Sequence, residues 1–324
     1  MRTYKLAHTD LEVSRIAFGT WHIGGSWDKT PATQDLKDRA NTLLSAAFEH
    51  GINHIDLADI YTLGKSDEVI GYALKQNPGL REKLVLQEKA GIIVGSDPDY
   101  GPPGRYNFLS EHLIKVVEGS LKRLGTDYVD LLAFHRPDPL VEPEEVAKAA
   151  EHLHKNGMVR YFGVSNHSPM QIELLKKSLD LPLVVNQLEL NLLHSYMVSN
   201  GVLVNLPAAP FANTQSVLEY CRLHDITVQA WSPVAGGKLF NPGPDEPENV
   251  QTVAKLIAEL AEQKNTTKEA IALGWLLRHP AGIQPILGTH KASRIADSVK
   301  ADEVTLDRAE WFALMEAARG APVP

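Results

Sequence analysis

Residues 128–165 read YVDLLAFHRPDPLVEPEEVAKAAEHLHKNGMVRYFGVS, and this stretch decides the fold class. Residues 128–135 form a nearly continuous apolar run, which is typical of a parallel strand that is covered on both faces. Residues 143–156 have the pattern of an amphipathic helix, and Gly157 stands where a helix end favours a left-handed residue. A second apolar run over 159–165 follows. The stretch therefore predicts one strand–helix–strand unit.

The same unit recurs along the whole chain of 324 residues. An N-terminal β-hairpin over 4–14 precedes eight predicted strands at 15–20, 52–56, 83–89, 128–135, 159–165, 183–187, 227–232 and 283–287. Helical patterns between them lie at 34–50, 66–76, 109–124, 143–156 and 214–224, and capping boxes at Ser168 and Thr266 begin two more.

Eight strand–helix units predict an α/β fold of the (β/α)8 barrel class, because eight is the number of strands that closes. No Gly-x-Gly-x-x-Gly follows the first strand, which argues against an open dinucleotide-binding sheet. We expect one barrel domain over 1–324. Three Pro/Gly-rich segments, 91–108, 191–213 and 235–248, follow strands and are predicted to be long βα loops on the catalytic rim.

Composition and charge exclude several classes of function. The formal charge of −8 argues against a nucleic-acid binder, which needs a basic face. No apolar window is long enough to span a membrane, and the start of the chain lacks the apolar core of a signal peptide, so we expect a cytoplasmic protein. Cys221 is the one cysteine and is predicted to be an inert buried thiol. The spacing of the histidines predicts no metal site.

Four polar residues stand at or just after the ends of three successive strands: Asp56, Tyr61, Lys89 and His135. A phenol has a pKa of about 10, and an ammonium beside Tyr61 would lower it. Asp56 would keep Lys89 charged, and the imidazole of His135 could orient a substrate carbonyl. Together these groups could protonate an oxygen while a hydride reaches the adjacent carbon.

Each of the four residues also has a simpler interpretation. Asp56 and Lys89 could form only a structural ion pair, Tyr61 could cap a loop, and His135 could be an interior imidazole. A barrel aldolase that uses Lys89 as a Schiff-base amine is a further hypothesis, although Asp56 would keep that amine protonated. The order of all four residues at successive strand ends favours the reductive chemistry.

The stretch 51–61, GINHIDLADIY, followed by Lys89 and His135, resembles the aldo-keto reductase superfamily and its Asp-Tyr-Lys-His tetrad. The resemblance covers almost the whole chain, including GVSN at 163–166, WSP at 231–233 and GTHKASR at 288–294, and 131–139 look most like a bacterial oxidoreductase branch. Thr62 departs from the family pattern, where many relatives have Gly. Asp297 and Ser298 stand where a Glu-Asn pair commonly contacts adenine.

The resemblance implies a nicotinamide cofactor across the barrel mouth, and we expect NADPH. It implies that Asn166 and Gln187 hold the carboxamide beside Ser165, and that Trp231 stacks under the nicotinamide ring. The segment after the eighth strand would bind a 2′-phosphate, and the segment after the seventh would lie along the pyrophosphate. The residues implied are Gly288, Thr289, Lys291 and Arg294 for the first, and Ser232, Ala235, Gly236, Gly237, Lys238 and Leu239 for the second.

The sequence predicts an NADPH-dependent reductase of small-molecule aldehydes or ketones. Aromatic residues on the rim are expected to line the substrate pocket: Trp21, Trp27, Tyr100, Tyr106 and Phe211. We expect a monomer or a small homo-oligomer. The alternative from another class is a cofactor-sensing regulatory protein with little turnover, as in the channel-associated members of this superfamily.

Overall fold

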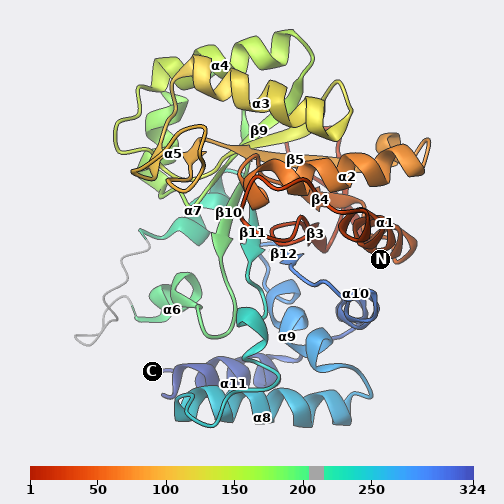
Figure 1. Cartoon of the computed structure of the whole chain (residues 1–324). Helices are drawn as coiled ribbons and strands as arrows, with labels where there is room; N and C mark the ends of the chain where they lie inside the picture. The colour runs from red at the N-terminus through yellow and green to blue at the C-terminus, as the bar shows by residue number, and fades with distance from the viewer. Residues whose placement is uncertain (204–214) are drawn as a thin grey trace.

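The computed structural model describes residues 1–203 and 215–324, and within them eight parallel strands close into a barrel (Figure 1). Neighbouring strands follow chain order around the barrel, which is the TIM-barrel arrangement and confirms the predicted class. The barrel strands are β3 (Ala17–Gly19), β4 (His54–Asp56), β5 (Val85–Ala90), β8 (Val129–Phe134), β9 (Val159–Ser165), β10 (Leu183–Glu189), β11 (Thr227–Trp231) and β12 (Gln284–Leu287).

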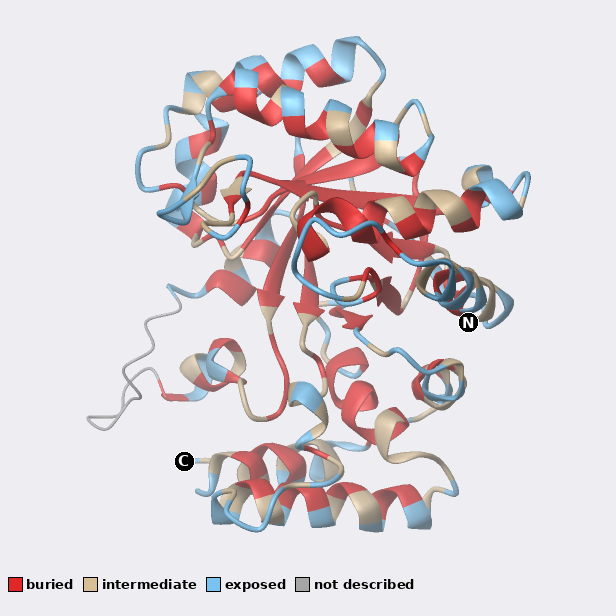
Figure 2. Cartoon of the chain, viewed as in Figure 1, coloured by how far each residue is buried: buried red, intermediate tan, exposed pale blue. Residues whose placement is uncertain are grey.

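Helices surround the barrel, and most of them bury one face, so that buried and exposed residues alternate along them while the barrel strands are mostly buried (Figure 2). The helices of the described residues are α1 (Gln34–Glu49), α2 (Lys65–Gln76), α3 (Ser110–Leu124), α4 (Pro143–Lys155), α5 (Pro169–Lys176), α6 (Tyr196–Leu203), α7 (Val217–Leu223), α8 (Glu248–Gln263), α9 (Lys268–Leu277), α10 (Ala292–Val299) and α11 (Arg308–Arg319). None of them is both long enough and apolar enough to cross a bilayer.

The helix-end signals of the sequence correspond to real helix ends. Ser168 caps α5, where its hydroxyl accepts from the amide of Gln171, as predicted. The second cap lies one residue later than predicted, because Thr267 rather than Thr266 accepts from the amide of Ala270 at 3.2 Å. Gly157 adopts the predicted left-handed conformation, with φ of 70°.

The N-terminal hairpin covers the end of the barrel where the strands begin. Its strands are β1 (Thr3–Lys5) and β2 (Glu12–Ser14). Leu6 and Val13 form a buried cluster with Leu131 and Val185, which stand near the beginnings of β8 and β10. Because the hairpin occupies this end, a ligand site is left to the opposite end, where the strands finish.

The long rim segments contain structure that the sequence did not predict. Segment 91–108 includes an antiparallel pair, β6 (Ile92–Ile93) and β7 (Arg105–Tyr106). Segment 191–213 begins with α6, and its residues from 204 onward lie outside the described part. Short 3-10 helices complete the chain: η1 (Tyr61–Gly64), η2 (Arg81–Lys83), η3 (Ala235–Gly237) and η4 (Lys300–Asp302).

At the C-terminal end of the chain, α8 and α11 lie side by side (Figure 1). The side chain of Asn249 donates to the carbonyl oxygen of Ala318 at 2.6 Å. Trp275 of α9 stacks on Trp311 of α11 at 5.1 Å between ring centres. Each indole also donates to the other residue's carbonyl oxygen, so both buried polar groups are satisfied. These contacts fix α11 to the helix layer.

Candidate active site

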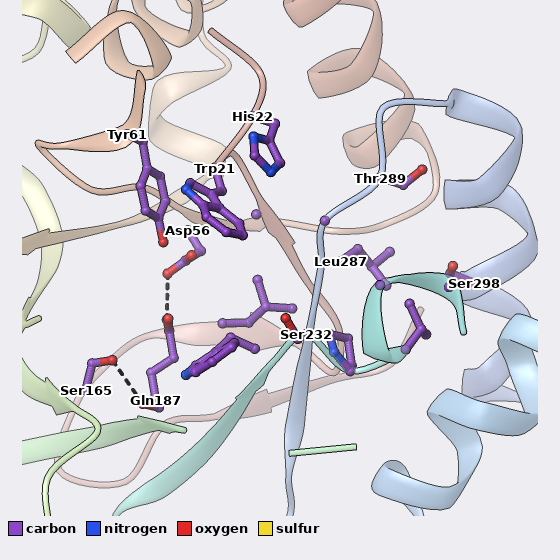
Figure 3. Close-up of a pocket in the computed structure, with 18 of the residues that line it drawn as sticks. Trp21, His22, Asp56, Tyr61, Ser165, Gln187, Ser232, Leu287, Thr289 and Ser298 are labelled. Atoms are coloured by element: carbon purple, nitrogen blue, oxygen red, sulfur yellow. Dashed lines mark hydrogen bonds between the residues drawn. The ribbon is translucent and has the colours of Figure 1, made fainter. Parts of the chain in front are cut away.

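A cavity of about 910 Å³ opens where the barrel strands end. Figure 3 shows Trp21, Asp56 and Tyr61 toward one side of it and Thr289 and Ser298 toward the other. Segments after β3, β4, β5 and β8 supply one half of the lining, and segments after β9, β10, β11 and β12 supply the other. The described residues of the first half are Gly19, Trp21, His22, Trp27, Asp56, Ile60, Tyr61, Ile92, Val94, His135 and Arg136.

The four predicted tetrad residues meet at this mouth. The ammonium of Lys89 donates to Oδ1 of Asp56 at 2.6 Å, and both side chains are buried. The same ammonium lies 4.8 Å from the centre of the Tyr61 ring. The rings of Tyr61 and His135 meet edge to face with centres 5.9 Å apart. Lys89 itself is not among the lining residues, because it lies beneath Tyr61 with no exposed surface.

Burial sets the protonation states of these groups. Burial raises the pKa of Tyr61 to about 12, although the Lys89 ammonium opposes the rise. The ammonium acts in the predicted direction, but desolvation outweighs it, so the net pKa of the phenol is raised rather than lowered. Burial by itself would lower the pKa of Lys89, but Asp56 and Tyr61 raise it above its usual value. Burial, with the positive charges of Lys89 and Arg136, holds the pKa of His135 well below its usual value.

Buried amides fix the position of Asp56. Oδ1 of Asp56 accepts from the side-chain amides of Gln187 at 2.6 Å and Gln87 at 3.2 Å. Gln87 also exchanges two hydrogen bonds of 2.8 Å with Gln229 across the barrel. The ring of His54 contacts Gln87, and burial lowers the pKa of His54 to about 4. A network of neutral side chains therefore supports the ion pair of Lys89 and Asp56.

The backbone after Tyr61 has a conformation that is unusual for residues other than glycine. Thr62 and Leu63 both have positive φ, at 50° and 56°, a region that glycine enters at lower cost. The hydroxyl of Thr62 donates to the carbonyl oxygen of Tyr61 at 2.7 Å and contacts the hydroxyl of Ser66. This local network holds the turn that aims the phenol at the mouth.

The other half of the mouth offers polar groups and a flat ring. Asn166 has φ of 60° and its amide donates to Ser165, while its oxygen accepts from the indole of Trp231 at 3.1 Å. Ser165 in turn donates to the carbonyl oxygen of Gln187. Because the Gln187 amide already donates to Asp56, its side-chain oxygen is the group that could receive a ligand's amide.

The backbone at this half leaves room for a large anionic ligand. A side-chain carbon placed on Gly236, Gly237 or Gly288 would meet no atom within 4 Å, and all three glycines line the cavity. Thr289 and Arg294 line it at the start of α10. Open backbone with a cation beside it fits the phosphates of a dinucleotide, and Trp231, Asn166 and Gln187 fit its ring.

The remaining predicted site residues divide between those that line the cavity and those that do not. Lys238 lines the cavity and is paired with Glu246 at 2.8 Å, and Ser232 lines it with φ of 50°. Leu239 is buried in the core. Phe211 lies outside the described residues. The described residues of the prediction that are not among the lining residues are Lys89, Ala235, Leu239, Lys291, Tyr100 and Tyr106.

Sequence reasoning missed several lining residues that carry polar groups. They are His22, Arg136, Asn241 and Glu269. His22 directly follows Trp21 and Arg136 directly follows His135, so a search of the positions next to each predicted residue would have found both. Glu269 belongs to α9, which does not follow a barrel strand directly, so the strand-end rule could not find it.

Comparison with known proteins agrees with this geometry. The model of the Aldo/keto reductase family matches residues 15–319. The chain belongs to the aldo/keto reductase family. A 6-dehydroglucose reductase from Agrobacterium fabrum (strain C58) is 36% identical over 321 residues, which are 97% of each chain. Oxidoreductase YdhF of Escherichia coli (strain K12) is 35% identical over 317 residues, 97% of this chain and 96% of its own.

Solved structures extend the likeness to three dimensions. The structure of a glycerol dehydrogenase from Gluconobacter oxydans superposes with a TM-score of 0.82 at 27% identity and covers 99% of this chain and 97% of its own. This aldo/keto reductase is thus an NAD(P)H-dependent oxidoreductase of carbonyl groups and their alcohols. The family resemblance stated from the sequence is confirmed.

Proposed function

We propose that this aldo/keto reductase uses NADPH to reduce a small-molecule aldehyde or ketone to the alcohol, in the cytoplasm, with Tyr61 as the proton donor. The observation that carries the proposal is the position of Tyr61, edge-on to His135 and above the Lys89 ammonium, at the open end of the barrel. A phenol with a raised pKa is protonated at neutral pH, as a general acid must be.

Each polar group has one task in this mechanism. The neutral imidazole of His135 holds the carbonyl oxygen near the phenol, and Tyr61 gives its proton to that oxygen. When bound, the reduced nicotinamide supplies the hydride to the carbonyl carbon. Lys89 stabilises the phenolate that remains on Tyr61, and Asp56 keeps Lys89 charged and in place. Solvent can then return a proton to Tyr61 after the alcohol leaves.

The change Tyr61→Phe tests the proton donor. We expect kcat for aldehyde reduction to fall by about 10²–10⁴-fold, because the ring stays and the acidic proton is lost. NADPH affinity, measured by quenching of tryptophan fluorescence, should change less than about threefold. Tyr72→Phe is the control, since the hydroxyl of Tyr72 on α2 donates to Asp38 on α1 and does not line the cavity. Turnover by Tyr61→Phe at the wild-type rate would refute the assignment.

The preference for NADPH depends on Arg294, an exposed cation at the start of α10 that borders the cavity. A guanidinium binds a 2′-phosphate strongly, and NADH lacks this group. We expect Arg294→Ala to weaken NADPH binding by about 10–100-fold in a fluorescence titration and NADH binding by less than about threefold. Lys255→Ala, an exposed change on α8, is the matched control. Equal losses for both cofactors would contradict the 2′-phosphate contact.

Direct measurements distinguish two alternative functions, a cofactor sensor and an aldolase, from the reductase. If NADPH binds but no aliphatic, aromatic, dicarbonyl or sugar-derived aldehyde is reduced, the cofactor-sensing role replaces the reductase. Sugar-derived aldehydes belong in the panel because of the name of the Agrobacterium relative. The aldolase hypothesis requires a neutral amine, whereas Asp56 and Tyr61 raise the pKa of Lys89. A covalent adduct after borohydride trapping would support the aldolase instead.

A further inference from the structure

Arg136 is a cation in the cavity that the tetrad mechanism does not use. It follows His135 at the end of β8, is partly exposed and lines the cavity. Within residues 1–203 and 215–324, its guanidinium has no hydrogen-bond or ion-pair partner. A guanidinium without a partner, beside the predicted carbonyl site, is available to a ligand.

The residues on both sides of Arg136 are fixed. The amide of His135 donates to the carbonyl oxygen of Ala90 at 2.9 Å, which ties this point to β5. Pro137 restricts the next backbone angle. Asp138 is buried, and its two carboxylate oxygens accept from the amides of Leu140 at 2.8 Å and Phe108 at 3.2 Å. The nearest acid in the sequence is therefore engaged by backbone amides, and the backbone that carries Arg136 is held in place.

Charge in the cavity is unevenly distributed. In the half supplied by β3, β4, β5 and β8, the described charged lining residues are Asp56 and Arg136, and Asp56 is balanced by Lys89. The charged lining residues described in the other half are Glu269 of α9, Arg294 of α10 and Lys238, which is paired with Glu246. The substrate half thus combines the apolar surfaces of Trp21, Trp27, Ile92 and Val94 with one unbalanced positive charge.

We propose that Arg136 binds an anionic group of the substrate, and that the preferred substrate is an aldehyde carrying a carboxylate a few atoms from its carbonyl. This inference rests on the proposed reductase function and deepens it. The planar guanidinium can take a carboxylate with two parallel hydrogen bonds, which positions the molecule as well as binding it. His135 then receives the carbonyl oxygen at the neighbouring position, and the apolar surfaces cover the carbon atoms between the two groups.

A pair of aldehydes that differ in one charge tests the inference. The probes are 4-formylbenzoate and its neutral methyl ester, each reduced by wild type, Arg136→Met, Arg136→Lys and Arg222→Met. Arg222 lies exposed on α7 and controls for the loss of a surface charge. We expect Arg136→Met to lower the ratio of kcat/KM for the carboxylate to that for the ester by about 10–100-fold, mainly through KM. Arg136→Lys should restore part of the ratio, and Arg222→Met should leave it unchanged.

The outcomes separate this inference from the proposed function. An unchanged ratio in Arg136→Met, with both aldehydes still reduced by wild type, overturns the role of Arg136 and leaves the reductase intact. If wild type reduces neither aldehyde, the product 4-(hydroxymethyl)benzoate is titrated calorimetrically into wild type and Arg136→Met. Binding that weakens about tenfold in the variant supports the anion site without turnover, whereas equal binding or no binding overturns it.

Discussion

Lys89 carries a fully buried positive charge, and the residues around it determine what that charge can do. Asp56 is its partner at 2.6 Å, and two glutamine amides donate to the same carboxylate oxygen of Asp56. A buried charge that loses its partner is costly, so this pair is fixed by its surroundings. The same burial that fixes the pair keeps Tyr61 protonated and His135 neutral. The protonation states of the site are thus consequences of packing.

These protonation states predict a flat pH profile. The pKa of Tyr61 is raised to about 12 and that of His135 lies well below its usual value, so neither group changes state between about pH 6.5 and 9. We expect kcat/KM for reduction of a neutral aldehyde to vary less than about threefold over this range, measured by NADPH oxidation. A steep rise or fall centred near pH 7 would show that one of these groups titrates there.

At the scale of the elements, Tyr61 depends on η1, a short turn between β4 and α2. The first turn of α2 is tied to α3 because Arg123 donates to the buried carboxylate of Asp67 at 2.8 Å. Farther along α2, Gly71 allows close approach, since a side-chain carbon there would lie 2.3 Å from the carbonyl oxygen of Arg123. The position of the turn that carries Tyr61 therefore follows from how tightly these two helices pack.

Two glycine substitutions test this packing. Gly71→Ala should lower the free energy of unfolding by about 1–3 kcal/mol, because the added methyl group meets the backbone of α3, which cannot move aside cheaply. Gly119→Ala in α3 should instead raise it by up to about 1 kcal/mol, since its nearest neighbour is the flexible end of Arg123 at 3.2 Å and alanine favours helix. Urea unfolding measures both. If both substitutions changed the free energy of unfolding in the same direction, the close contact between Gly71 and the backbone of α3 would be refuted.

The sequence predicted the barrel because its strands and helices have clear periodicity and end signals, as at Ser168 and Gly157. It predicted the tetrad because each member stands at or beside a strand end. It missed the pair β6–β7, whose two-residue strands are too short to show a period of two. It gave the correct direction for the effect of Lys89 on the pKa of Tyr61 but not the net direction, since the sequence names the neighbouring ammonium but not the depth of burial.

At the scale of the whole molecule, a second polar cluster lies between the barrel and its helix layer. Asp67 and Glu88 are buried there and Asp59 is half-buried, and each has one buried carboxylate oxygen without a partner among the described residues. Arg123 donates to Asp67 and is the cation of the cluster. Burial, together with the nearby charge of Asp67, raises the pKa of Asp59 to about 8. The carboxyl group of Asp59, at the interface between the two layers, is therefore protonated at neutral pH.

This cluster predicts how stability depends on pH. An aspartate in the unfolded chain has a pKa of about 4, so between about pH 4 and 8 the folded state binds the Asp59 proton that the unfolded state has lost. The contribution of this group to the free energy of unfolding is complete below about pH 4 and decreases as the pH rises toward 8, because unfolding releases a proton.

The change Asp59→Asn removes the titration, so the free energy of unfolding of this variant should increase relative to that of wild type by a few kcal/mol between pH 5 and 9. Urea unfolding at several pH values measures the difference, with the exposed change Asp180→Asn as control. Parallel curves for wild type and Asp59→Asn would show that Asp59 is already ionised in the folded protein.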